Sequence, residues 1–107
     1  MARYLVLWRV NPAAPWPTDP SETLKLLEVM WATIDDLQKK GEIEEGGYFL
    51  DGNSGYAIVE GDGMDIFRQS NMFLPYMAGE IQEIITFEKA KEITKALLEA
   101  QIAATKK

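Results

Sequence analysis

The chain has 107 residues, which is enough for one domain with a hydrophobic core but too few for two. It contains no cysteine and no histidine, which excludes disulfides, thiolate nucleophiles, histidine-based triads, haem-ligating histidines and zinc sites of the usual kind. Acidic side chains outnumber basic ones 17 to 11, and this excess argues against binding to nucleic acid or to an anionic membrane.

The first predicted element is a strand over residues 3–10, RYLVLWRV. Side chains of a strand alternate between its two faces, and a strand with one face in water alternates apolar with polar residues. Here one face carries Tyr4, Val6, Trp8 and Val10, and the other carries Arg3, Leu5, Leu7 and Arg9. Both faces are apolar, with arginines only towards the ends, so we expect both to be covered.

A proline-rich loop and a long helix follow. Four of the five prolines lie in NPAAPWPTDPSE, residues 11–22, so the start of this segment forms neither helix nor central strand. Asp19 suits an N-cap, Pro20 the first helical position and Glu22 the third, which predicts a helix over residues 20–40. Apolar residues recur in this segment at helical spacing, and Gly41 suits its end.

The second half of the chain begins with a predicted hairpin. Strand-like runs over 43–50 and 55–60 flank the sequence DGNSG, in which Gly and Asn can supply the positive φ of a tight turn. A second helix is expected from an N-cap at Asp62, with Asp65 at its third position, to the neighbourhood of Pro75. A fourth strand over 80–88 and a C-terminal helix over 90–105 complete a single domain of residues 1–107.

The order of elements is β-α-β-β-α-β with an extra C-terminal helix, which is that of a ferredoxin-like α+β fold with an antiparallel sheet. Both connecting helices then cover one face of the sheet. We expect a second copy to cover the other face by two-fold, sheet-to-sheet packing, giving a homodimer. No apolar run approaches the roughly 18 residues of a membrane span, and no cleavage site follows the start, so we expect a cytoplasmic protein without a membrane partner.

Three segments resemble the dimeric α+β barrel superfamily: YLVLWRV, GYAIVEGDG and FLPYMAGEIQEIITF. The resemblance spans residues 2–88 and includes the small muconolactone-isomerase-like and antibiotic-biosynthesis-monooxygenase-like proteins, many of unknown function. It implies a ferredoxin-like dimeric barrel that binds small, often aromatic molecules between sheet and helices or between the two sheets. Members include cofactor-free oxygenases, isomerases and cyclases, and proteins without a known reaction. No family catalytic motif is recognisable here, so the resemblance assigns no catalytic residue.

Six side chains are candidate ligand contacts: Trp8, Arg9, Trp16, Tyr56, Tyr76 and Glu83. Trp8 could line an apolar cavity, or it could be a core or interface tryptophan. Arg9 could meet an anionic or enolisable oxygen of a ligand, or it could pair with a carboxylate. Trp16, on the proline-rich loop, could be a lid over the mouth of a cavity or a plug packed on the partner subunit.

The other three candidates are tyrosines and a carboxylate. Tyr56 and Tyr76 could donate hydrogen bonds to a carbonyl or enolate, or they could be core aromatics with a solvated hydroxyl. Glu83 and Glu60 lie within strands, where burial would raise the pKa of the carboxyl and suit it to acid–base chemistry. The alternative is a cross-strand ion pair, which antiparallel pairing predicts between Glu60 and Arg3.

These observations predict a protein that binds an apolar or aromatic small molecule. It could act on that molecule without a cofactor, as an isomerase, cyclase or oxygenase of secondary metabolism or aromatic degradation. It could instead be a non-catalytic binding or accessory protein, or a purely structural interaction module. A desolvated Glu, Arg or Tyr in an apolar cavity would favour an enzyme, a cavity without such groups a binding protein, and a filled core a structural module. We expect no metal and no cofactor.

Overall fold

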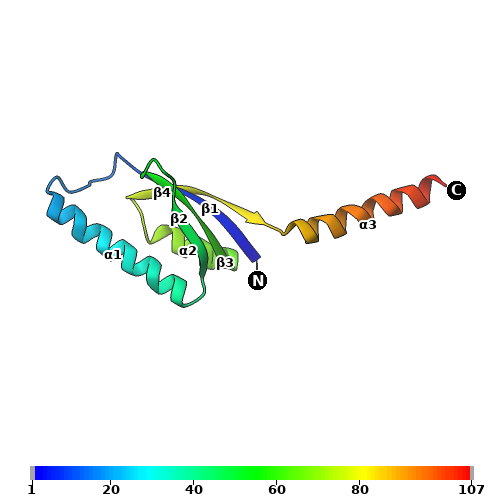
Figure 1. Cartoon of the computed structure of the whole chain (residues 1–107), viewed down its shortest axis with the longest axis horizontal. Helices are drawn as coiled ribbons and strands as arrows, with labels where there is room; N and C mark the ends of the chain where they lie inside the picture. Colours follow the sequence, from blue (N-terminus) through cyan, green and yellow to red (C-terminus); the bar gives the residue numbers. More distant parts are fainter. Residues whose placement is uncertain (1, 107) are drawn as a thin grey trace.

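The computed structural model describes residues 2–106. Its elements are β1 (Ala2–Val10), α1 (Pro20–Lys39), β2 (Ile43–Tyr48), β3 (Ser54–Gly61), α2 (Gly63–Asn71), β4 (Met77–Ile84) and α3 (Phe87–Thr105). The four strands form one antiparallel sheet in the order β2-β3-β1-β4 (Figure 1). The predicted α+β architecture is therefore confirmed, and it is compatible with a ferredoxin-like fold.

The two faces of β1 have different surroundings. The buried cluster joins Leu37 of α1, Ile66 of α2 and Val59 of β3, and Val6 of β1 packs against it. The face that carries Tyr4, Val6, Trp8 and Val10 is therefore the one covered by α1 and α2. The face that carries Arg3, Leu5, Leu7 and Arg9 has no helix over it in the described part of the chain, and we call it the helix-free face.

Local signals place both ends of α1, the start of α2 and the hairpin turn close to where the sequence predicts them. The side chains of Asp19 and Asp62 accept hydrogen bonds from backbone N–H groups in the first turns of α1 and α2. Gly41 follows α1 with a φ of 79°, a conformation that glycine adopts without steric cost. In the hairpin turn, Gly52 has the predicted positive φ, at 75°. Asn53 does not have a positive φ, so that part of the prediction is wrong.

Strand β4 begins and ends earlier than predicted. The alternating pattern predicted a strand over 80–88, but the ladder with β1 runs from Met77, opposite Val10, to Ile84. The length of β1 decides these ends, because each of these residues finds a backbone partner on it. Thr86 then caps α3, since its hydroxyl oxygen accepts a hydrogen bond from a backbone N–H of the first helical turn.

The same caps and turns move two helix boundaries. Helix α2 ends at Asn71, four residues before Pro75, and turns connect it to β4. Helix α3 begins at Phe87 instead of residue 90, because its N-cap lies at Thr86.

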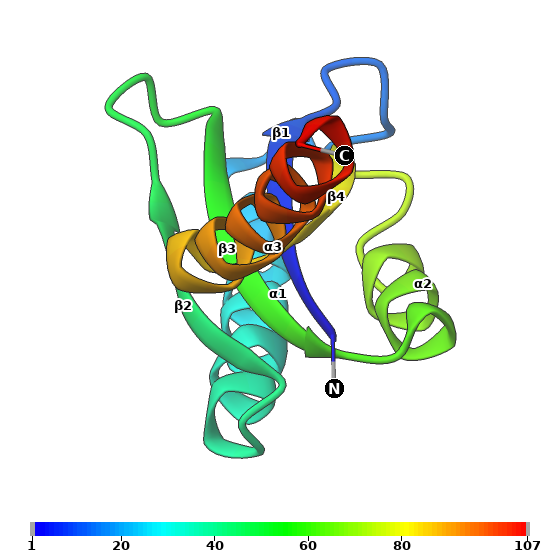
Figure 2. The same cartoon turned by 90° about the vertical axis from the view of Figure 1, so that its right-hand side faces the viewer.

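Helix α3 stands apart from the rest of the domain. Figure 1 and Figure 2 show it extending away from the end of β4, and the long axis of the molecule measures 73 Å. None of its residues is buried. Its large aliphatic side chains are each more than half exposed, namely Ile93, Leu97, Leu98 and Ile102. These apolar side chains therefore lack a covering partner within residues 2–106. Between residues 2 and 106, no helix combines the length and the hydropathy needed to cross a membrane.

Candidate ligand cavity

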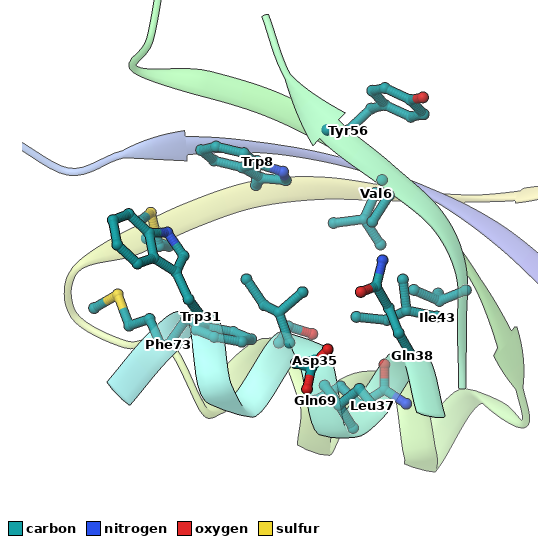
Figure 3. A pocket seen from close by; sticks show the side chains of 18 of the residues that line it. Val6, Trp8, Trp31, Asp35, Leu37, Gln38, Ile43, Tyr56, Gln69 and Phe73 are labelled. Atoms are coloured by element: carbon teal, nitrogen blue, oxygen red, sulfur yellow. The ribbon is translucent and has the colours of Figure 1, made fainter. Parts of the chain in front are cut away.

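An apolar cavity of about 430 Å³ lies between the sheet and helices α1 and α2. The sheet contributes Val6 and Trp8 of β1 and Ala57 of β3, and the helices contribute side chains such as Trp31 and Phe73, which follows α2 (Figure 3). This volume lies within the range of about 300–1,000 Å³ that small-molecule sites occupy.

Glycines beside Trp8 make room for its indole ring. The two cross-strand neighbours of Trp8 are Gly55 on β3 and Gly79 on β4. A Cβ on Gly55 would overlap the Trp8 indole and the carbonyl oxygen of Gly47. A Cβ on Gly79 would lie 2.6 Å from the carbonyl oxygen of Leu7. Glycine at position 55 therefore lets the indole lie over β3, and glycine at position 79 lets the backbone of β4 approach that of β1 closely.

A second row of small residues deepens the cavity. Val6 of β1 lies opposite Ala57 of β3, and Ala57 lies opposite Gly46 of β2. All three residues line the cavity. Because this row carries little side-chain volume, α1 and α2 cannot fill the space over the centre of the sheet.

The core around this cavity is thin. Five apolar residues are buried in the described part of the chain, namely Met30, Leu37, Ile43, Val59 and Ile66, and no large side chain is completely buried. Interiors of stable domains are normally close-packed. These residues therefore do not form the filled core that would favour a purely structural module.

Three of the aromatic side chains that line the cavity contact one another. The rings of Trp8 and Tyr48 meet edge to face with their centroids 4.9 Å apart. The indole Nε1 of Trp31 on α1 donates a hydrogen bond to the Tyr48 hydroxyl at 3.0 Å. A second, more open hollow lies against the same Trp31 and Tyr48 and extends to Trp16.

The proline-rich loop holds Trp16 beside this second hollow. Its indole Nε1 donates to the carbonyl oxygen of Asn11 at 2.7 Å, and its ring meets Tyr76 edge to face at 4.8 Å. Trp16 is half-buried. The geometry thus brings two candidates, Trp16 and Tyr76, together next to the cavity. A lid function for Trp16 stays a prediction.

Two candidates lie away from the cavity. Arg9 is exposed on the helix-free face, opposite Ser54 of β3. Glu83 is exposed on β4, opposite Tyr4. Neither residue lines either hollow, so the structure does not bring them to the place where Trp8 lies.

Tyr56 borders the cavity, but its ring lies on the other side of its strand from α1 (Figure 3). Its hydroxyl donates a hydrogen bond to the Glu45 carboxylate at 2.8 Å, and Phe49 stacks on its ring. The hydrogen bond to Glu45 raises the pKa of Tyr56 above its ordinary value. This shift moves the hydroxyl further from neutral pH and does not suit it to proton transfer.

The predicted proximity of Arg3 and Glu60 is confirmed by the register of β1 and β3. Arg3 nevertheless donates its hydrogen bond to Glu44 of β2, with 2.7 Å between Nη2 and Oε2. This bond lowers the pKa of Glu44 and raises that of Arg3. Glu44 could not be recognised as the partner of Arg3 from the sequence, because an irregularity in the pairing of β2, between Ile43 and Glu45, changes its register with β3.

Few polar groups line the cavity. Asp35 is paired with Lys39 at 2.9 Å, and the hydroxyl of Ser70 donates to the carbonyl oxygen of Ile66 at 2.7 Å. Gln69 is buried, and its amide nitrogen lies 3.4 Å from a carboxylate oxygen of Glu42. No lysine or arginine is among the residues that line it in the described chain.

Neither a metal cluster nor a known family accounts for the site. Over residues 2–106, no three acidic side chains gather into a group that could hold a metal ion. No family model matches this chain, and no curated protein matches it.

Proposed function

We propose that this chain is a non-catalytic binding protein for a neutral apolar or aromatic small molecule. The observation that carries this proposal is the apolar cavity of about 430 Å³ with Trp8 on its floor. Filling such a space with a ligand removes apolar surface from water at about 25 cal/mol per Å². The thin core supports the proposal, because a ligand would supply the packing that the side chains leave incomplete.

Binding fits these residues better than isomerase, cyclase or oxygenase chemistry. A general acid or base needs a titratable group within reach of the ligand and a pKa matched to its task. The carboxylate at this cavity, Asp35, is engaged by Lys39. The Tyr56 hydroxyl is engaged by Glu45, and Glu83 and Arg9 lie elsewhere.

We infer that two copies assemble through the helix-free face, in the manner of a ferredoxin-like dimeric barrel. Leu5 and Leu7 of β1, Ile58 of β3 and Ile84 of β4 share that face by register. An apolar sheet face of this kind is typical of an interface. The β-α-β-β-α-β order, with both connecting helices on the opposite face, is compatible with such a barrel.

The exposed aliphatic side chains of α3 support a role for it in the same assembly. Within one copy they are each more than half exposed, namely Ile93, Leu97, Leu98 and Ile102. Contact between α3 of one copy and the other copy would cover part of this apolar surface.

The binding proposal is tested by calorimetric titration of the full chain with indane, a neutral aromatic hydrocarbon. We expect saturable binding with a dissociation constant on the order of 0.1 mM. Ala57→Leu places added volume in the cavity and should weaken binding at least about tenfold without lowering thermal stability. Ala78→Leu is the matched control, because Ala78 lies opposite Arg9 on the helix-free face. Equal affinity in all three proteins, or no binding, would contradict the proposal.

A further inference from the structure

Trp8 differs from the other two tryptophans in its hydrogen bonding. The indole Nε1 of Trp16 donates to the carbonyl oxygen of Asn11, and that of Trp31 donates to the Tyr48 hydroxyl. Within the described residues, Nε1 of Trp8 has no such acceptor, although its ring lines the cavity. This nitrogen is not among the buried unpaired side-chain atoms of the described residues, so water can reach it in the open cavity. Because an indole N–H can only donate, a ligand that displaces this water must supply an acceptor or leave the donor unpaired.

A second polar group lies near the same part of the cavity. Figure 3 shows the indole nitrogen of Trp8 on the side of the ring towards Val6, and the Gln38 side chain extending from α1 towards the sheet near Val6. Gln38 is exposed and lines the cavity. An amide can donate as well as accept, so Gln38 can also bind an acceptor oxygen.

The surrounding charges disfavour an anionic ligand. Asp35 is the acidic side chain at the cavity, and lysine and arginine are absent from its described lining. The chain as a whole carries a net charge of −6. Burying a carboxylate or phosphate here would leave it without a cationic partner, which is costly in an apolar environment.

We propose that the ligand is a neutral aromatic carbonyl compound whose oxygen accepts a hydrogen bond from Nε1 of Trp8, with Gln38 as a second donor. This inference rests on the proposed binding function and specifies the chemical class of the ligand. Gly55 leaves room for the indole over β3, and the indole N–H then provides a directional contact in a mainly apolar cavity. A hydrocarbon ligand fills the same volume but leaves this donor without a partner.

The test compares 1-indanone with indane, which have the same fused ring skeleton and differ by one carbonyl oxygen. Each is titrated calorimetrically into the wild-type chain and into Trp8→Phe, which retains an aromatic ring but lacks the N–H. We expect the ratio of ketone affinity to hydrocarbon affinity to fall about tenfold in Trp8→Phe. Ala78→Leu on the helix-free face is the control, because Ala78 does not line the cavity, and its ratio should stay within about twofold of wild type.

The outcomes separate the inference from the proposed function. Binding of both compounds with the same affinity ratio in wild type and Trp8→Phe would overturn the inference and leave the binding function standing. Binding of neither compound to the wild type would overturn both. If Trp8→Phe does not fold, the inference is tested instead by the NMR chemical shift of the Trp8 indole N–H in the wild-type chain. It should move downfield with 1-indanone and not with indane, and equal movement with both would overturn the inference.

Discussion

Replacing Gly55 by alanine should destabilise the domain, although alanine is normally the better residue in a strand. A Cβ at this position would overlap both the carbonyl oxygen of Gly47 on β2 and the indole of Trp8 on β1. The carbonyl belongs to the backbone, so either the β2–β3 pairing or the indole must move. Overpacking of this kind costs about 1–3 kcal/mol. The lower backbone entropy of unfolded alanine offsets roughly 0.5–1 kcal/mol of that cost.

At the middle of these two ranges the net loss is about 1.3 kcal/mol, which corresponds to a fall in melting temperature of roughly 5–10 °C for a domain of this size. Thermal denaturation followed by circular dichroism measures it. Gly63→Ala is the matched control, because a Cβ there would have only the Tyr4 hydroxyl near it, at 4.0 Å. The control should melt within about 3 °C of wild type or above it. A Gly55→Ala protein as stable as Gly63→Ala would refute the argument that glycine is required beside Trp8.

Three further outcomes are expected. In sedimentation velocity, the wild-type chain should be a dimer and Leu7→Glu, on the helix-free face, should be a monomer. Val29→Glu, on the exposed surface of α1, is the control and should remain a dimer. A folded wild-type monomer at micromolar concentration would contradict the assembly. Because its bond to Arg3 lowers the pKa of Glu44, the stability this bond contributes is present above the ordinary carboxyl pKa and is lost as pH falls below it. Between about pH 6 and pH 3, the melting temperature of Glu44→Gln should thus fall less than that of the wild-type chain. An equal fall in both proteins would count against this reasoning. Trp16→Ala should reduce indane affinity several-fold while moving the melting temperature by only about 3 °C, whereas a loss mainly of stability would make Trp16 a structural plug.

The features that the sequence predicted well depend on neighbouring residues. Asp19, Pro20 and Gly41 determine the ends of α1 through local hydrogen bonds and backbone preferences, so no knowledge of the rest of the fold was needed. The hairpin between β2 and β3 follows in the same way from its turn sequence. The end of β4 is different, because it depends on pairing with β1. These two strands are some seventy residues apart in the chain.

The candidate site was predicted only in part for a related reason. Both faces of β1 are apolar, and alternation alone does not show which one the helices cover. Trp8 and Arg9 were therefore both candidates, yet they lie on opposite faces. What distinguishes them is that two glycines, Gly55 and Gly79, lie opposite Trp8. This pairing can be recognised only when the register of β1, β3 and β4 is known. Gln38 lacked any such signal, because it follows the apolar stripe of α1 as an ordinary polar residue.

The central claim is that the space between the sheet and helices α1 and α2 binds a neutral small molecule. A titration of the isotopically labelled full chain with 1-indanone, followed by amide and indole N–H chemical shifts, tests it most directly. The account predicts saturable shifts concentrated at Val6, Trp8, Ala57 and Val59, with small changes at Leu5 and Leu7 on the helix-free face. Shifts concentrated on the helix-free face, or no saturable shifts at all, would contradict it.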